Sequence, residues 1–113
     1  MLDYLTDFID YIRIERSLSK NTVAAYENDL QRFCEYLESN KIIAPFSVKL
    51  QDIQKFISEL RELGLSKRTI ARNISAIKSF YKFLSLEDII EADPTEFLDT
   101  ARMPKKLPEV LEI

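Results

Sequence analysis

The sequence predicts an all-α domain: a bundle of four main helices arranged as two helical hairpins, followed by a short C-terminal helix. Apolar residues recur at intervals of three and four along four segments, the spacing of helices with one buried face. One glycine and four prolines in 113 residues are few for the tight turns of a sheet protein. A repeat aligns Leu18–Thr22 with Leu65–Thr69, and the residues after each copy also match in apolar character. This repeat predicts two similar helical hairpins that pack together.

The first hairpin is expected in the N-terminal half of the chain. Its first helix runs from about Leu2 to Arg16. Its second helix begins after Ser19 and ends near Ser39–Asn40. The segment 41–49, which contains Pro45, is predicted to be a loop. The apolar stripes of the two helices are Leu2, Leu5, Phe8, Ile9 and Ile12, and then Val23, Tyr26, Leu30, Phe33, Cys34 and Leu37.

The second hairpin follows the loop. Gly64 stands where a glycine ends a helix, so the third helix is predicted from about Leu50 to the residues before it. A fourth helix then extends to about Leu84, and Thr95–Ala101, after Pro94, is a candidate short fifth helix. The apolar stripes of the third and fourth helices are Ile53, Phe56, Ile57 and Leu60, and then Ile70, Ile74, Ile77, Tyr81 and Leu84.

Two serines and the single cysteine are interpreted as structural. Ser19 and Ser66 precede equivalent helices, where a hydroxyl oxygen accepts a hydrogen bond from an otherwise unpaired backbone N–H. The chain has no histidine to activate either serine as a nucleophile. Cys34 lies within an apolar stripe, which predicts a buried small side chain.

Composition excludes several kinds of site. A single cysteine cannot form an intramolecular disulfide, which predicts a reducing, cytoplasmic location. Without histidine, no metal site and no cofactor are expected. No apolar run approaches the length of a membrane span, and the N-terminus lacks the pattern of a signal peptide. We therefore expect no membrane partner.

Positive charge is concentrated on the segment Leu65–Leu84. The segment has no acidic residue, and its five basic residues are Lys67, Arg68, Arg72, Lys78 and Lys82. Because these contribute +5 to a total of −3, the rest of the chain carries −8. On a helix, Arg68, Arg72 and Ser75 fall almost opposite the buried stripe, so this outer face is predicted to be basic with no acid to neutralise it.

The charge pattern predicts a polyanionic partner, because like charges one turn apart destabilise a helix. DNA or RNA is the favoured partner, and a solvated face or an acidic protein partner are the alternatives. The second helix carries a weaker version of the pattern. Its first turns present Lys20, Asn21, Thr22 and Ala25, and a helix N-terminus favours phosphate. Two equivalent helices are thus predicted to meet one duplex.

Several segments in order resemble the N-terminal core-binding, SAM-like domain of tyrosine recombinases, the family of phage integrases and Xer-type enzymes. These segments are "LSKNTVAAYENDLQRFCEYL", "LSKRTIARNISAIKSFYKFL", "DPTEFL" and "PKKLPEVL", so the resemblance covers nearly the whole chain. In that family the domain is a bundle of four or five helices that forms half of a clamp around a recombination site. The resemblance implies a DNA-binding domain at residues 1–102 and a linker at 103–113 towards a C-terminal catalytic domain.

The resemblance also implies which residues contact DNA. In the family, the second and fourth helices lie against the major groove. The positions that match in this sequence, with Lys78 added from the basic segment, are Lys20, Asn21, Thr22, Ala25, Lys67, Arg68, Thr69, Arg72, Ser75 and Lys78.

The expected function is that of a DNA-binding domain of a site-specific recombinase, which grips the site and positions the catalytic domain. The family's catalytic tyrosine, arginines and histidine belong to that other domain, so no strand cleavage is expected from this chain. The implied partners are double-stranded DNA, the catalytic domain and other recombinase protomers, and the isolated domain is expected to be a monomer. The alternatives are a helix-turn-helix regulator and a helical protein-interaction module.

Overall fold

A computed structural model of the chain describes residues 2–15, 18–96 and 98. Its four α-helices and one short 3-10 helix are α1 (Leu2–Glu15), α2 (Lys20–Ser39), η1 (Pro45–Ser47), α3 (Leu50–Glu62) and α4 (Lys67–Leu86). No strand occurs among these described residues. The all-α prediction and its four main helices are therefore confirmed, and the predicted loop contains one helical turn at Pro45.

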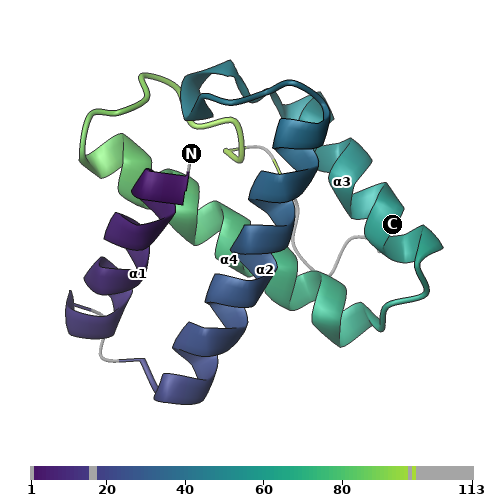
Figure 1. The fold of residues 1–113 in the computed structure, drawn as a ribbon, viewed down its shortest axis with the longest axis horizontal. Coiled ribbons are helices and arrows are strands. Elements are labelled where there is room, and N and C mark those ends of the chain that lie inside the picture. Colours follow the sequence, from purple (N-terminus) through teal and green to yellow (C-terminus); the bar gives the residue numbers. More distant parts are fainter. Residues whose placement is uncertain (1, 16–17, 97, 99–113) are drawn as a thin grey trace, which may run out of the picture.

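The other three helices pack around α4, as Figure 1 shows. This helix crosses behind α1 and α2 in that view and contacts α1, α2 and α3. Sequence neighbours also pack, since α1 lies on α2 and α3 lies on α4, while α2 additionally contacts α3. The arrangement as two equivalent hairpins stays a prediction, because the strong α2–α4 contact crosses the boundary between them.

The core is built from the predicted apolar stripes and is rich in aromatic rings. Phe8 of α1 meets Phe80 of α4 with ring centroids 5.5 Å apart, and Phe33 of α2 meets Phe56 of α3 at 5.2 Å. Phe33 also lies edge-on to Tyr81, with centroids 6.4 Å apart. Edge-to-face pairs of this kind add to the stabilisation that burial provides. All four helices are thus joined by one core.

The helix ends follow from the local sequence. Ser19 accepts a hydrogen bond from the backbone N–H of Thr22 at 3.2 Å, and Ser66 accepts one from that of Thr69 at 3.1 Å. Both predicted caps are confirmed. Gly64 has a φ of +83°, a conformation that side chains with a Cβ rarely adopt. This glycine ends α3 and lets the chain turn into α4, as the sequence predicted.

Beyond α4 the chain returns across the bundle. The Thr95 hydroxyl donates to Oδ1 of Asp93 at 2.6 Å, and the Leu98 N–H donates to the Thr95 carbonyl at 3.0 Å. Thr95 and Glu96 lie in a turn. Most of the predicted fifth helix, Thr95–Ala101, and the whole predicted linker at 103–113 lie outside the described residues.

Candidate nucleic-acid interface

The ten predicted contact residues lie on α2 and α4, within the first three or so turns of each helix. Both helices begin in the lower part of Figure 1, so their N-termini face the same side of the molecule. Lys20 and Asn21 are exposed on α2, and Lys67, Arg68 and Arg72 are exposed on α4. The others are half-buried, namely Thr22, Ala25, Thr69, Ser75 and Lys78.

The two helix starts repeat each other in atomic detail. The Ser19 hydroxyl donates to Oγ1 of Thr22, and the Ser66 hydroxyl donates to Oγ1 of Thr69, both at 3.0 Å. Each threonine hydroxyl keeps its own proton, which can be donated to an acceptor outside the protein. Each helix start therefore offers backbone N–H groups, a threonine hydroxyl and a lysine to an anion.

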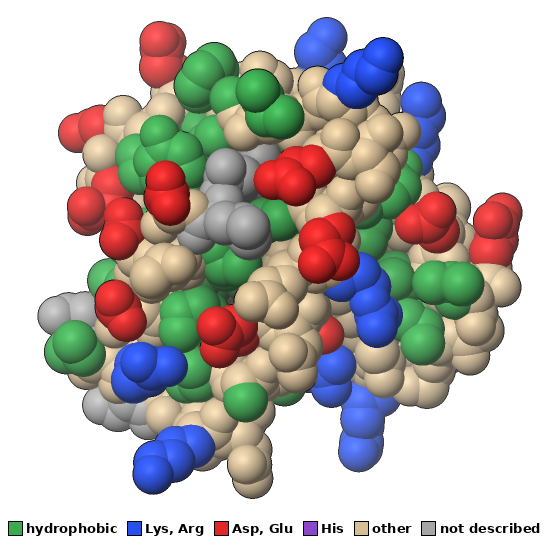
Figure 2. Space-filling model, in the orientation of Figure 1, with side chains coloured by type: hydrophobic (Ala, Val, Ile, Leu, Met, Phe, Trp, Pro, Cys, Tyr) green, Lys and Arg blue, Asp and Glu red, His purple; other side chains and the backbone are tan. Residues whose placement is uncertain are grey.

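Lys and Arg side chains gather at particular places on the visible surface. In Figure 2 the charged side chains along the lower edge, where α2 and α4 begin, are Lys and Arg. Acidic side chains are spread over the upper left, the middle and the right of the same view, and a second group of Lys and Arg side chains lies at the upper right. A chain with a net charge of −3 thus presents a basic edge where the two helices start.

One part of the predicted basic face is wrong in a specific way: Arg72 does have an acidic partner. Its Nε donates to Oδ2 of Asp29 at 2.7 Å, and its Nη2 donates to Oδ1 at 2.9 Å. Asp29 belongs to α2, and its side chain is only 6% exposed, whereas that of Arg72 is 41% exposed. The hydrogen bond to Asp29 raises the pKa of Arg72 above its ordinary value, so the guanidinium stays charged. The expectation of a face without an acid considered α4 alone, and the acid comes from α2.

The position of Asp29 in the sequence indicates that its carboxylate has a partner. Asp29 is three residues after Tyr26 and four before Phe33, so it lies on the apolar stripe of α2. A carboxylate on a buried stripe requires a cation or several donors. Which cation supplies that partner depends on how α4 crosses α2, so the sequence could not name it.

Lys78 is also engaged within the protein. Its Nζ donates to the Leu98 carbonyl at 2.8 Å and so ties α4 to the returning chain. This contact leaves Lys78 half-buried and directs its ammonium group towards Leu98. Lys20, Lys67 and Arg68 have no ion pair among the described residues, and they are the freest cations of the ten.

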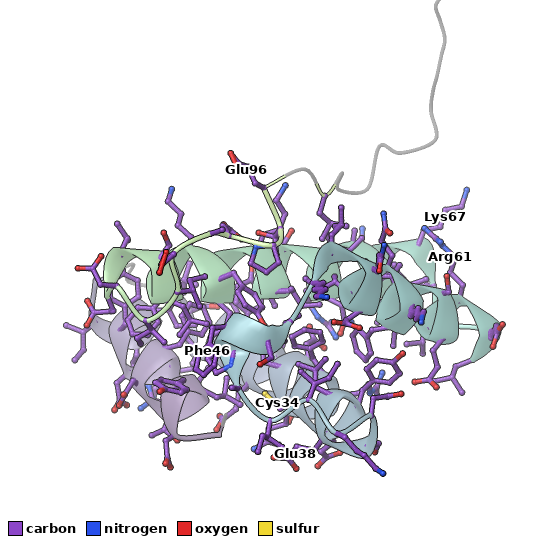
Figure 3. All side chains as sticks on the ribbon, turned by 90° about the horizontal axis from the view of Figure 1, so that it is seen from above. Cys34, Glu38, Phe46, Arg61, Lys67 and Glu96 are labelled. Carbon is purple, nitrogen blue, oxygen red and sulfur yellow. The ribbon has the colours of Figure 1, made fainter. Side chains whose placement is uncertain are left out.

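A further cation lies near the start of α4. Arg61, in the last turn of α3, is exposed, and Figure 3 shows it at the same end of the molecule as Lys67. In the sequence Arg61 stands between Glu59 and Glu62, so it belongs to no run of basic residues. The turn at Gly64 is what brings the end of α3 towards the start of α4.

Other kinds of site are not formed by the described residues. They contain no group of three side chains suited to hold a metal ion. None of their helices is both long and apolar enough to cross a bilayer. Cys34 is 1% exposed, and burial raises the pKa of its thiol to about 12, so it is a protonated core side chain.

Comparison with known proteins identifies the relatives of this sequence. It is 38% identical over 111 residues to the tyrosine recombinase XerC of Roseiflexus castenholzii, which covers 98% of this chain and 35% of the relative. It is 40% identical to the tyrosine recombinase XerD of Staphylococcus epidermidis and 43% identical to that of Chlorobaculum tepidum, each over 109 residues and 96% of this chain. The chain spans about a third of the length of these relatives, namely 37% of the Staphylococcus and 36% of the Chlorobaculum protein.

No solved structure was found to match the chain with significance. The family described as the phage integrase N-terminal SAM-like domain matches residues 5–88, from α1 to the end of α4. That match spans most of the sequence and all four helices. Together with the identity to the recombinases, it shows that this chain belongs to the family of phage integrase N-terminal SAM-like domains.

Proposed function

We propose that the chain is the DNA-binding domain of a site-specific tyrosine recombinase, which grips the recombination site and positions a catalytic domain for strand exchange. The observation that carries the proposal is the pair of matching helix starts on α2 and α4, each capped, basic and turned to the same side. The relatives are the tyrosine recombinases XerC and XerD, and they suggest the reaction.

The contact set follows from exposure and charge. Lys20, Lys67 and Arg68 supply free cations for phosphates, while Thr22 and Thr69 supply hydroxyl donors at the helix starts. Asn21, Ala25, Arg72 and Ser75 lie along the same faces and are candidates for contacts with base edges. Lys78 contributes least to DNA binding, because its ammonium group is bound to the Leu98 carbonyl.

The partners in this proposal are duplex DNA, the catalytic domain and further recombinase protomers on the same site, all in the cytoplasm. Strand cleavage is assigned to the catalytic domain. The chain alone grips only part of the DNA circumference, so its affinity is expected in the non-specific range, about micromolar or weaker at physiological salt.

The test is titration of the chain with duplex DNA at several salt concentrations. If Lys20, Lys67 and Arg68 each neutralise a phosphate, the logarithm of the binding constant falls against that of salt with a slope of about −3, at about 0.9 per phosphate. Backbone amide signals at Lys20–Thr22 and Lys67–Thr69 are expected to shift on binding. A folded chain whose signals do not move at low salt contradicts the proposal and favours a protein partner for the basic helix.

A further inference from the structure

We propose that Asp29 is a positioning residue for DNA recognition, because it holds the Arg72 guanidinium between α2 and α4 with one edge free to face DNA. The inference rests on the proposed function. It assigns a role in DNA recognition to an acidic side chain, although the surrounding face is basic.

The geometry of the ion pair leaves a defined part of the guanidinium available. Asp29 binds Nε and one hydrogen of Nη2 through its two carboxylate oxygens. A guanidinium has five N–H donors in a rigid plane, so both hydrogens of Nη1 and one of Nη2 remain. No hydrogen-bond partner for them occurs among the described residues. Nη1 and Nη2 together form the fork that matches O6 and N7 of guanine, or two phosphate oxygens.

Burial explains why Asp29 can act as a fixed support. Its side chain is 6% exposed and lies within the stripe that packs α2 on the bundle, so its position is set by the fold. A free arginine loses much rotamer freedom when it binds DNA. Arg72 has already lost that freedom on folding, so the entropic cost of ordering its side chain on DNA is smaller.

The ion pair also fixes the spacing of the two DNA-facing helices. Asp29 belongs to α2 and Arg72 to α4, and the residues are 43 positions apart in the chain. Arg72 lies one turn after Arg68, and Asp29 lies one turn after Ala25, so the pair lies next to the predicted contacts along both helices. A change in the ion pair is therefore expected to alter base recognition more than general affinity.

A variant that removes the charge of Asp29 distinguishes the positioning role from a purely electrostatic effect. Changing Asp29 to Asn deletes a negative charge beside the DNA, so a purely electrostatic account predicts tighter binding to every duplex. The positioning role predicts weaker binding to the preferred sequence, because a neutral amide no longer holds the guanidinium at both nitrogens. The two accounts thus predict changes of opposite sign.

The experiment begins with the unmodified 113-residue chain and a pool of duplexes with a randomised centre. Sequencing the bound fraction gives a preferred duplex, and a scrambled duplex of the same composition serves as reference. The measured quantity is the ratio of the two dissociation constants. In Asp29→Asn and in Arg72→Lys, which keeps the charge but not the fork, this ratio is expected to fall by about 5-fold or more, the range for losing a bidentate contact.

Asp10→Asn is the matched control. Asp10 also pairs with an arginine of α1, Arg13, but the two atoms are 3.6 Å apart. The side chain of Asp10 is 62% exposed and that of Arg13 is 59% exposed. This variant changes the net charge of the chain by the same amount as Asp29→Asn. Its ratio of dissociation constants is expected to equal that of the unmodified chain, and melting curves of all variants verify that each is folded.

The outcomes distinguish the inference from the proposed function. If the unmodified chain binds no duplex at low salt, both are overturned. If it binds without sequence preference, or if Asp29→Asn keeps the full ratio, the positioning role is overturned and DNA binding stands. If Asp29→Asn does not fold, Arg72→Lys decides alone, because Asp29 there keeps a cation beside it. An unchanged ratio in Arg72→Lys then overturns the inference.

Discussion

Arg72 is the side chain whose role changes most between sequence and structure. The sequence predicts it as an outward-facing cation on a basic face with no acid to neutralise it. Its bond to a carboxylate that is 6% exposed makes it structural as well. The expectation that no acid neutralises this face is therefore wrong at Arg72, while its contact with DNA stays a prediction.

Arg72→Ala is expected to lower the free energy of unfolding by about 1–3 kcal/mol, because a buried carboxylate loses its partner. The half-exposed position of Arg72 keeps this figure below the cost of breaking a fully buried pair. Arg68→Ala, one turn earlier and without an ion pair among the described residues, is the control and is expected to stay within about 0.5 kcal/mol. Chemical denaturation of both variants measures the difference. Equal stabilities contradict a structural role for Arg72.

Tyr81 is 0% exposed, and its hydroxyl has no hydrogen-bond partner among the described residues. Its ring packs against Phe33 and Phe80. Tyr81→Phe keeps the ring and removes an unpaired polar group. We expect unchanged stability or a gain of up to about 1 kcal/mol. Tyr26→Phe, at a half-buried position, is the control, and a loss of more than about 1 kcal/mol in Tyr81→Phe means that the hydroxyl has a partner.

Cys34 makes the stability of the chain depend on alkaline pH. Burial raises the pKa of its thiol from 9.0 to about 12, and it also raises the pKa of Tyr81. A group whose pKa is raised by folding stabilises the folded state below its unfolded pKa and loses that effect as the pH rises. The thiol above about pH 9, and the Tyr81 hydroxyl above about pH 10, are each expected to lower the free energy of unfolding by about 1.4 kcal/mol per pH unit.

Urea denaturation at pH 8, 9 and 10 tests this expectation against Cys34→Ala, which lacks the thiol. The variant starts from a lower stability because a cavity is created, but its stability should fall less steeply with pH. Parallel pH dependences for the two proteins contradict a buried, protonated thiol.

At the scale of the element, α4 has two faces with different tasks. Ile74 and Ile77 are 0% and 1% exposed, and the predicted apolar stripe is the face that packs on α1, α2 and α3. Asn73 is also fully buried, and its amide donates to the Thr69 carbonyl at 2.8 Å. The buried face of α4 is thus wider than its apolar stripe.

Ile77→Ala is expected to destabilise the chain by about 2–5 kcal/mol, because the lost branched aliphatic side chain leaves a cavity in the core that all four helices share. Ser79→Ala, two residues on and half-buried, is the control and is expected to cost less than about 1 kcal/mol. Thermal melting of both variants is sufficient to distinguish them. Similar melting temperatures would show that α4 is rotated relative to the face assigned here.

At the scale of the whole molecule, charge is organised by position. The chain carries −3 overall, yet the charged side chains along the edge where α2 and α4 begin are Lys and Arg. Among the described Lys and Arg residues of α2 and α4, Arg72 alone forms an ion pair, with Asp29. Steering of DNA is therefore expected to depend on where a cation lies more than on the net charge.

Lys67→Gln and Lys41→Gln remove the same charge at different places. Lys67 opens α4, whereas Lys41 lies just past the C-terminal end of α2, about 30 Å along the helix from Lys20 at 1.5 Å per residue. Lys67→Gln is expected to weaken duplex binding severalfold and to reduce the salt slope by about 1. Lys41→Gln is expected to do neither. Equal losses in the two variants would indicate unspecific attraction over the whole surface.

The sequence by itself determined the helices, their caps and the core. Periodicity placed Val23, Leu30, Ile74 and Ile77 in the interior, and each is buried. Ser19, Ser66 and Gly64 marked helix ends correctly, because caps depend on a few neighbouring residues and on φ at one position. Local rules of this kind act within one turn of helix, and a single sequence contains all that they require.

Only the tertiary structure decided which side chains meet across helices. Asp29 and Arg72 are 43 positions apart, and Lys78 reaches the Leu98 carbonyl 20 positions on. The wheel of α4 correctly placed Arg72 on the outer side but had no information on what α2 presents there. The crossing of two helices is fixed by packing over their whole contact surface, so an ion pair between them cannot be deduced from the periodicity of either one.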